Sequence, residues 1–306
     1  MDNLFISHPA CTGHSMGELH PESPERLLAI RQALLDSGWF DQMTEVQARP
    51  ATREQLLRAH SEAHVDLIFN ASPDSGLVAL DPDTAMNPLT LNAALHASGA
   101  VITAVEAVCG GRAKRAFCNV RPPGHHAERA KPMGFCFFNN VAVGAMVALD
   151  ELGLSRVAIV DFDVHHGNGT EDIFQAESRV LMVSSFQTGL YPGSGDQPLG
   201  ANMVNVPLSG GSDGSAVRQA CEQQWIPALE AFEPELILIS AGFDAHREDQ
   251  LAGLRWDEGD YEWLTRQIVS VAARLGHGRV VSVLEGGYSL PALGRSVSRH
   301  IGGLIA

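Results

Sequence analysis

Cysteine is scarce in this sequence, and the few cysteines follow no recognisable pattern. The 306 residues contain five, an odd number without a C-x-x-C pair: Cys11, Cys109, Cys118, Cys136 and Cys221. A disulfide framework needs paired cysteines, and a thiolate zinc site needs them at short spacing. The sequence therefore predicts neither, and the pattern is typical of a reducing compartment, so we expect a cytoplasmic protein.

Long apolar runs are also missing. The sequence has no stretch of about 18 consecutive apolar residues, which is the length that a membrane-spanning helix requires. Its first residues, from Met1 to Phe5, have neither the basic region nor the apolar core of a signal peptide. We therefore expect no transmembrane helix and no secretion signal.

Basic residues are few compared with acidic ones. Lys and Arg together number 21 and Asp and Glu number 36, which gives a net charge of -15. An acidic surface repels nucleic acids and anionic membranes, so we expect neither as a partner. The same charge would attract basic peptides or polyamines.

The second half of the chain alternates between short apolar segments and segments with a helical pattern. Strands are expected at residues 116–119, 157–162, 180–184, 236–240 and 280–284, and helices at 139–152, 214–232 and 257–275. Upstream, a strand is expected at 4–7, helices at 24–38, 52–60 and 89–108, and a surface loop at 72–88. Such alternation predicts a mostly parallel sheet with helices on both faces. Because no linker or repeat divides the chain, we expect one α/β domain over residues 1–306.

The densest group of reactive side chains lies in residues 161–170, directly after an apolar strand. This segment reads Asp-Phe-Asp-Val-His-His-Gly-Asn-Gly-Thr. Ligands of α/β proteins bind at the carboxyl ends of the strands, and Asp163 and His165 would project to the same side of an extended chain. One carboxylate and one imidazole provide part of a catalytic zinc site. The alternative is a polar turn that caps the next helix.

Similar groups follow three other expected strands. The adjacent His125 and His126 follow one strand, Asp244 follows a second and Tyr288 follows a third. Any one of them alone would be weak evidence, because an Asp after a strand is usually a helix cap. Since the carboxyl ends of parallel strands meet at one edge of a sheet, their joint occurrence predicts a single site.

These residue types can be combined into a hydrolytic centre. Asp244 would complete a metal site with Asp163 and His165 and leave one coordination position open for water and substrate. Two carboxylates and one imidazole suit Zn²⁺, with Fe²⁺ or Co²⁺ as substitutes. The two adjacent histidines, His125 and His126, would then serve as general base and acid.

Three neighbouring groups would support this chemistry. Asp161 can orient one imidazole by accepting its N–H, and Asn168 can do the same for the other without adding charge. Tyr288 can donate a hydrogen bond to a developing oxyanion. Together these groups predict hydrolysis of an amide or an ester.

Five segments resemble, in the same order, the signature sequences of zinc-dependent histone deacetylases; they are residues 121–127, 134–140, 161–170, 240–245 and 284–288. The similarity extends from residue 21 to Tyr288 and is closer to the class II and bacterial members, including acetylpolyamine amidohydrolases. The resemblance implies a single-domain arginase-like α/β fold and hydrolysis of Nε-acyl-lysine or a related acylamide.

The resemblance also implies roles for individual residues. The zinc ligands would be Asp163, His165 and Asp244, and the catalytic residues His125, His126 and Tyr288, with Asp161 behind His125 and Asn168 behind His126. Gly134 and Phe135 match one wall of the substrate tunnel, and Tyr191 matches the facing wall, where the family normally has Phe. A structural potassium ion is implied near Asp161, Asp163, His165, Ser184 and Phe174.

At the tunnel mouth the resemblance leaves alternatives open. Asp83 matches a carboxylate that holds the backbone of the substrate, or else it is an ordinary turn residue. Leu251 occupies the position where polyamine-selective members have an acidic residue. Acyl-lysine peptides or proteins are therefore favoured as substrates, and acetylpolyamines are the alternative. Arg26 matches a buried Arg beside the product exit, or is a surface residue of its helix.

A non-catalytic module that binds acyl-lysine is the third hypothesis. Such a protein should lack a metal ligand, a catalytic histidine or the tyrosine, and none is missing here. His246 is expected to point outward, and Cys136 is expected to pack in the core. The sequence indicates neither the length of the acyl group, the metal used in the cell, nor the oligomeric state.

Overall fold

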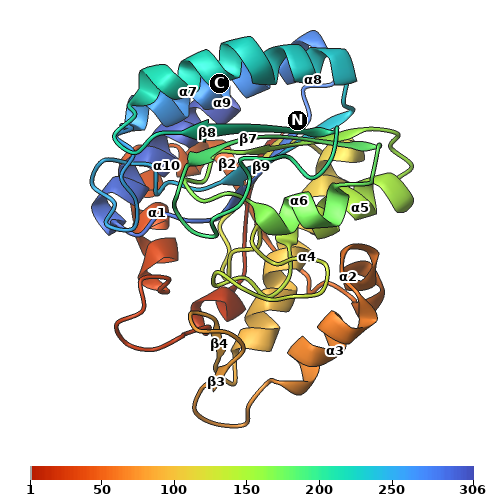
Figure 1. Ribbon diagram of the computed structural model, residues 1–306, viewed down its shortest axis with the longest axis vertical. Coiled ribbons are helices and arrows are strands. Elements are labelled where there is room, and N and C mark those ends of the chain that lie inside the picture. The colour runs from red at the N-terminus through yellow and green to blue at the C-terminus, as the bar shows by residue number, and fades with distance from the viewer. Residues whose placement is uncertain (1) are drawn as a thin grey trace.

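A sheet of eight strands forms the centre of the protein in the computed structural model, which describes residues 2–306 (Figure 1). The order is β2-β1-β5-β10-β9-β6-β7-β8, and every neighbouring pair in it is parallel. The strands are β1 (Asp2–Ser7), β2 (Met43–Gln47), β5 (Ala113–Cys118), β6 (Val157–Asp161), β7 (Val180–Gln187), β8 (Met203–Leu208), β9 (Leu236–Ala241) and β10 (Val280–Leu284). The fold is the single-domain α/β architecture that the sequence predicts.

The central strands are buried on both faces. Every residue of β6, β9 and β10 is buried, and these strands consist mostly of Val, Ile and Leu. A strand covered by helices on both sides has no need of alternating polar residues, so a short continuous apolar run is its usual pattern. At the edge of the sheet, β2 has no fully buried residue.

Helices cover the two faces of the sheet in two groups (Figure 1). One face carries α2 (Arg53–Ala59), α3 (Glu62–Asn70), α4 (Thr90–Cys109), α5 (Asn140–Asp150) and α6 (Asn168–Phe174), and the other carries α1 (Glu25–Asp36), α7 (Gly214–Ala220), α8 (Ile226–Phe232), α9 (Glu258–Arg274) and α10 (Leu290–Ile305). The apolar side chains between each layer and the sheet form a continuous core.

One core helix is long and apolar enough to span a membrane by length and composition. It is α4, with 20 residues. Most of it is buried in the protein, where it packs against α5 and β5. The expectation of no transmembrane helix stays a prediction, and the apolar surface of α4 is covered by the core of the domain.

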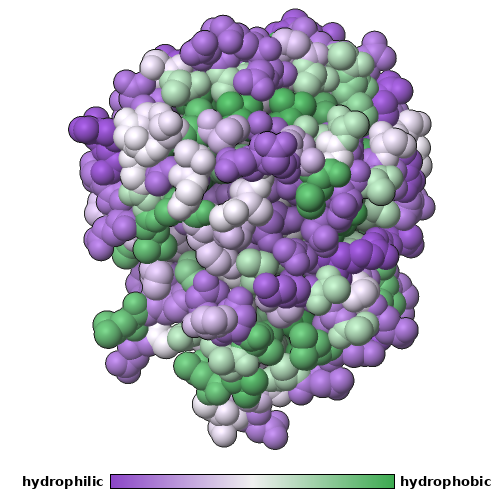
Figure 2. Space-filling model, viewed as in Figure 1, coloured by the Kyte–Doolittle hydropathy of each residue, from purple (hydrophilic) through white to green (hydrophobic). Residues whose placement is uncertain are grey.

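Several expected boundaries differ from the observed ones. The helix expected over residues 214–232 is α7 and α8 joined by a π-helical turn, Cys221–Trp225. The loop at 72–88 contains a two-stranded antiparallel pair, β3 (Val78–Ala79) and β4 (Ala85–Met86). Polar residues cover most of the face seen in Figure 2, and apolar ones gather over this pair, where Leu77 and Val78 are exposed.

Candidate active site

Four adjacent strands carry the reactive side chains at their carboxyl ends. β5, β10, β9 and β6 lie side by side in the middle of the sheet. They are followed by His125 and His126, by Tyr288, by Asp244, and by Asp163 and His165, respectively. The fold thus brings together residues that are up to 163 positions apart in the chain, counted from His125 to Tyr288.

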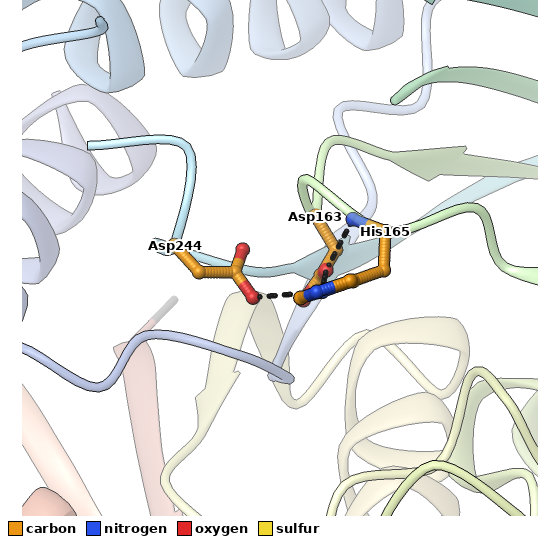
Figure 3. Close-up of side chains that lie close together, drawn as sticks. All are labelled: Asp163, His165 and Asp244. Atoms are coloured by element: carbon orange, nitrogen blue, oxygen red, sulfur yellow. Dashed lines mark hydrogen bonds and ion pairs between the residues drawn. The ribbon is translucent and has the colours of Figure 1, made fainter. Parts of the chain in front are cut away.

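Asp163, His165 and Asp244 form a compact cluster (Figure 3). His165 Nδ1 lies 3.0 Å from Asp163 Oδ1 and 3.2 Å from Asp244 Oδ2. One potential ligand atom from each residue lies within 4.8 Å of the others. The segment is a bend rather than an extended strand, so the predicted reason for the convergence is wrong. Asp163 and His165 converge because Asp163 Oδ1 accepts the backbone N–H of His165 at 2.9 Å.

The donor set fits a divalent cation. Asp244 is fully buried, its Oδ1 accepts the N–H of Val164, and its Oδ2 is paired with His165 Nδ1 but accepts no well-aligned hydrogen bond from the described residues. Burial and the negative charge of Asp163 raise the pKa of Asp244 to about 6. A buried carboxylate oxygen without a well-aligned hydrogen bond is costly in a protein, and a bound cation would offset that cost. Two carboxylates and an imidazole are ligands that zinc accepts, and three protein ligands leave a position open.

Glycines provide the space for these carboxylates. A Cβ atom at Gly286 would overlap Asp244 Oδ2, and one at Gly242 would overlap Asp163 Oδ2. The N–H of Gly286 also donates to Asp163 Oδ2 at 2.8 Å. The close approach of the backbone explains why glycine follows the strand at each of these positions.

The two adjacent imidazoles lie next to this cluster. The rings of His125 and His126 have centroids 4.0 Å apart. His125 Nδ1 lies 3.0 Å from Asp161 Oδ2, and His126 Nδ1 lies 2.8 Å from Asn168 Oδ1. The predicted pairs are therefore both present, one with a carboxylate and one with an amide.

The surroundings separate the pKa values of the two histidines. Burial opposes the charged form of His125, but Asp163 and Asp161 raise its pKa to about 10. Burial and the neighbouring His125 charge lower the pKa of His126 well below its usual value. Two adjacent titratable groups with opposite shifts are typical of an acid–base pair.

Two carboxylates that the sequence interpretation missed hold the backbone of this site. Glu285 Oε2 accepts the N–H groups of Gly124 and His125 at 2.7 and 3.2 Å. Asp249 Oδ2 accepts the N–H of Tyr288 at 2.7 Å. Glu285 directly follows an apolar strand, and this position is a signal that could have singled it out.

A cavity of about 190 Å³ leads to the histidines and is lined by the predicted tunnel residues Asp83, Gly134, Phe135, Tyr191, Leu251 and Tyr288. Gly134 has φ +56°, and a Cβ atom there would lie 2.5 Å from Cδ2 of His126. Phe135 also has a positive φ, 68°, and its N–H donates to Thr84 Oγ1. An aromatic residue in this conformation is rare and is typical of a functional site.

The opening of the cavity contains Tyr191, Leu251 and Asp83. Tyr191 is 37% exposed, and its ring lies edge-on to His126, with centroids 5.1 Å apart. Burial and the neighbouring Asp81 raise the pKa of Asp83. Asp83 Oδ1 accepts the hydroxyl hydrogen of Thr84, so this carboxylate has a turn contact and also faces the cavity.

Two ambiguous residues are buried. Arg26 is fully buried, its Nε donates to the carbonyl of Gly287 at 2.7 Å, and its guanidinium lies 5.0 Å from the centroid of the Tyr288 ring. Of the two alternatives for Arg26, the surface position is therefore wrong. The expectation that His246 points outward is also wrong, because it is only 1% exposed. His246 Nδ1 accepts the N–H of Glu248, which turns the ring into the loop.

The residues suggested for potassium separate into two groups. Asp161 and Ser184 are cross-strand neighbours on β6 and β7, next to Asp163 and His165. Phe174 ends α6, and its carbonyl accepts a hydrogen from Nδ2 of Asn202 at 2.9 Å. The same amide donates to the carbonyls of Glu177 and Val180. Phe174 therefore belongs to a separate group of carbonyls, and its role as a potassium ligand stays a prediction.

The fold and the site define a hydrolase with its reactive groups at the carboxyl edge of a parallel sheet, and comparisons with known proteins give its family. A family model described as the histone deacetylase domain matches residues 20–304. The chain belongs to the histone deacetylase family, and it is a hydrolase of the deacetylase and amidohydrolase type.

Individual relatives agree with this assignment. Histone deacetylase 10, chloroplastic, of Oryza sativa subsp. japonica is 40% identical over 94% of this chain and 71% of its own length. The histone deacetylase-like amidohydrolase of Pseudomonas aeruginosa is 37% identical over 98% of this chain and 80% of its own. The crystal structure of the HDA15 HD domain superposes with a TM-score of 0.93 at 34% identity, covering 99% of this chain and 89% of that one.

Proposed function

We propose that the protein is a zinc-dependent deacylase that removes acyl groups from Nε-acyl-lysine side chains. The observation that carries this proposal is that His165 of the three-residue cluster lines the same cavity as His125 and His126, with Asp163 and Asp244 beside His165. The aromatic rings of Phe135 and Tyr191 line that cavity. Apolar walls suit the methylene groups of an extended lysine side chain, and a buried polar end suits its acyl amide.

Asp163, His165 and Asp244 would hold the zinc ion, with Asp244 Oδ2 as one ligand atom. Bound zinc supplies Lewis-acid polarisation of a carbonyl and lowers the pKa of water. The chain's own residues would perform the remaining steps. His126, with a lowered pKa, accepts a proton from the attacking water at Nε2.

His125 and Tyr288 would act on the other side of the reaction. His125, with a raised pKa, donates its proton to the lysine nitrogen as the C–N bond breaks, so that carboxylate and amine are formed. Burial raises the pKa of Tyr288 well above its usual value, which keeps the hydroxyl protonated. That hydroxyl donates a hydrogen bond to the acyl oxygen as negative charge develops there.

Acetylpolyamines are the second candidate substrates, because Asp83 faces the cavity and Asp81 lies next to it. Carboxylates near an opening can bind the ammonium groups of a polyamine. Leu251, which also lines the cavity, offers no such partner. We propose peptides or proteins as the main substrates for this reason.

A structural potassium ion near Asp161, Asp163, His165 and Ser184 is part of the proposal. Asp161 on β6 and Ser184 on β7 are paired across the two strands, and Asp163 and His165 follow Asp161 in the chain. The ion would lie beside the zinc ligands and stabilise the turn that carries them. Replacing potassium with a larger cation that binds such sites poorly is expected to lower thermal stability and activity together.

The first experiment is a substrate panel with zinc-loaded protein. It compares acetyl-, longer acyl- and trifluoroacetyl-lysine peptides with acetylputrescine and acetylspermidine, each with and without a hydroxamate. We expect hydroxamate-sensitive hydrolysis of the lysine peptides that is lost on chelation and recovered with zinc. More efficient turnover of acetylpolyamines would overturn the substrate assignment. No turnover of any substrate by zinc-loaded protein would favour a binding module instead.

A further inference from the structure

A third side chain extends the contact between His126 and Asn168. Asn168 Oδ1 faces His126 Nδ1 at 2.8 Å, and Asn168 Nδ2 donates to Glu128 Oε1 at 2.8 Å. Nδ2 also donates to the sulfur of Met133 at 3.3 Å. His126 and Asn168 are buried and Glu128 is half-buried, so the chain leads from the cavity toward the surface.

The chemistry of these groups fixes the direction of every hydrogen bond. An ionised carboxylate can only accept, so the Asn168 atom that faces Glu128 must be the NH₂ group. Both hydrogens of that NH₂ group have acceptors, Glu128 and Met133. The carbonyl oxygen of Asn168 must then face His126, whose Nδ1 must carry the hydrogen. His126 Nε2 is left with a lone pair.

We propose that Glu128 is a positioning residue that sets the tautomer of His126 through Asn168. This inference rests on the proposed role of His126 as the base. Without Glu128, the amide of Asn168 can turn over and present its NH₂ group to His126 Nδ1. The imidazole would then carry its hydrogen on Nε2, and a protonated Nε2 cannot accept a proton from water.

The other histidine does not need such a device. His125 faces Asp161, and a carboxylate accepts a hydrogen bond whichever oxygen it presents. An amide next to His126 avoids a second buried negative charge, but an amide has two different ends. Glu128 therefore supplies the orientation that an Asp in place of Asn168 would have supplied by itself.

The segment that carries Glu128 is itself held in place. His60 Nδ1 donates to the carbonyl of Glu128 at 3.0 Å, and His60 Nε2 accepts the N–H of Asn139 at 2.9 Å. The N–H of Glu128 donates to the carbonyl of Lys131 at 2.9 Å. The backbone at Glu128 is therefore fixed on both sides, as a residue that orients another side chain requires.

The first test compares Glu128→Ala, Glu128→Gln and the charge control Glu18→Ala, an exposed residue. Glu128→Ala is expected to lower kcat by about tenfold or more, with KM and thermal stability nearly unchanged. Gln can still accept the amide hydrogen through its oxygen, so Glu128→Gln is expected to keep most of the activity. Glu18→Ala is expected to have no effect on kcat.

A second change separates orientation from a merely structural role. Asn168→Asp in the Glu128→Ala background restores an acceptor that cannot be inverted, so kcat is expected to rise above that of Glu128→Ala alone. Asn168→Asp alone places two carboxylates against each other and is expected to be slower than the double variant. If Asn168→Asp lowers kcat equally in both backgrounds, Glu128 does not act through Asn168.

A direct readout is the nitrogen chemical shift of the His126 ring in protein labelled with ¹⁵N-histidine. We expect the Nδ1–H tautomer in the unmodified protein and a detectable Nε2–H population in Glu128→Ala. An unchanged tautomer would overturn the proposal. Full activity of His126→Ala would refute the role of His126 as the base. Absence of turnover by the unmodified zinc-loaded protein would refute the proposed function, so the failures can be distinguished.

Discussion

At the scale of single residues, the site depends on glycines, whose lack of a side chain leaves space for the catalytic groups. Gly134 is the clearest case, because its positive φ and its closeness to the His126 ring both exclude a side chain. A Cβ atom there would push the imidazole away from Asn168. The position of the His126 ring therefore depends on the backbone of Gly134 in the cavity wall.

Gly134→Ala is expected to lower kcat by more than tenfold, because small displacements of a catalytic group are costly. The matched control is Gly153→Ala. Gly153 also has a positive φ, +73°, but nothing lies within 4 Å of its added Cβ. This control is expected to lose about 1–2 kcal/mol of stability from the left-handed backbone and to keep its kcat. Equal loss of kcat in both variants would show that backbone strain alone is responsible.

Tyr288→Phe is expected to lower kcat by about 10²-fold or more, because it removes a donor to the developing oxyanion. The control is Tyr261→Phe. Tyr261 is also buried, and its hydroxyl has no hydrogen-bond partner among the described residues. Steady-state kinetics and the zinc content of both variants provide the measurement. Tyr288→Phe with normal kcat and full zinc would remove Tyr288 from the mechanism.

How far the sequence predicts the site depends on what each residue contacts. The cluster of Asp163, His165 and Asp244 follows from strand ends and from the residue types that bind metals. Glu128 and Asp249 could not be predicted, because they act through a side-chain amide or a backbone N–H group, whereas Glu285 could have been singled out by its place directly after an apolar strand. Such contacts depend on the path of distant loops and leave no characteristic spacing in the sequence.

At the scale of secondary structure, the interior strands could be predicted, whereas the two edge strands and the helices α3, α6 and α10 were missed. The interior strand β10 coincides with its expected range, 280–284, because a short continuous apolar run is typical of a parallel strand covered on both faces. The missed strands β2 and β8 lie at the two edges of the sheet, where polar residues are tolerated. Helix α6 has seven residues, which is too short for a clear periodicity.

The side-chain amide of Asn202 connects the end of α6 to the start of β7. Its Nδ2 group donates to the carbonyls of Phe174, Glu177 and Val180, a group of oxygens that could also hold a cation. Asn202→Ala is expected to lower the free energy of unfolding by about 1–3 kcal/mol, since buried carbonyls lose a donor. Asn202→Asp places a carboxylate among carbonyl oxygens, so it should be less stable than the Ala variant at low salt. Potassium is expected to stabilise the Asp variant selectively, as measured by urea unfolding. Equal stability of this variant with and without potassium would show that these oxygens do not bind the cation.

At the scale of the whole molecule, buried neutral histidines make stability depend on pH. His300 is fully buried between Thr265 and Ser282, at 2.6 and 2.8 Å, and burial lowers its pKa to about 3. The unfolded chain binds a proton near pH 6.5 and the folded chain does not. Stability from this group is therefore complete above pH 6.5 and is lost as the pH falls toward 3.

The expected slope is at most about 1.4 kcal/mol per pH unit for one such histidine. Between pH 6.5 and 5, where most carboxylates stay ionised, His300→Gln should show a smaller slope than the unmodified protein. Its stability at pH 8 serves as the reference for lost packing. Denaturant unfolding at several pH values gives both numbers, and parallel curves for the two proteins would contradict the assignment.

The position of β10 has a consequence for how the chain reaches this structure. β10 is the last strand in chain order, yet it lies between β5 and β9 near the middle of the sheet. Until it inserts, β1, β2 and β5 form one strip, and the strands from β6 to β9 form another, each with an open edge. Such edges are prone to wrong pairing, and contacts between distant segments form slowly. The insertion that closes the sheet also brings Gly286 and Tyr288 to the site, so the catalytic groups can assemble only when folding is nearly complete.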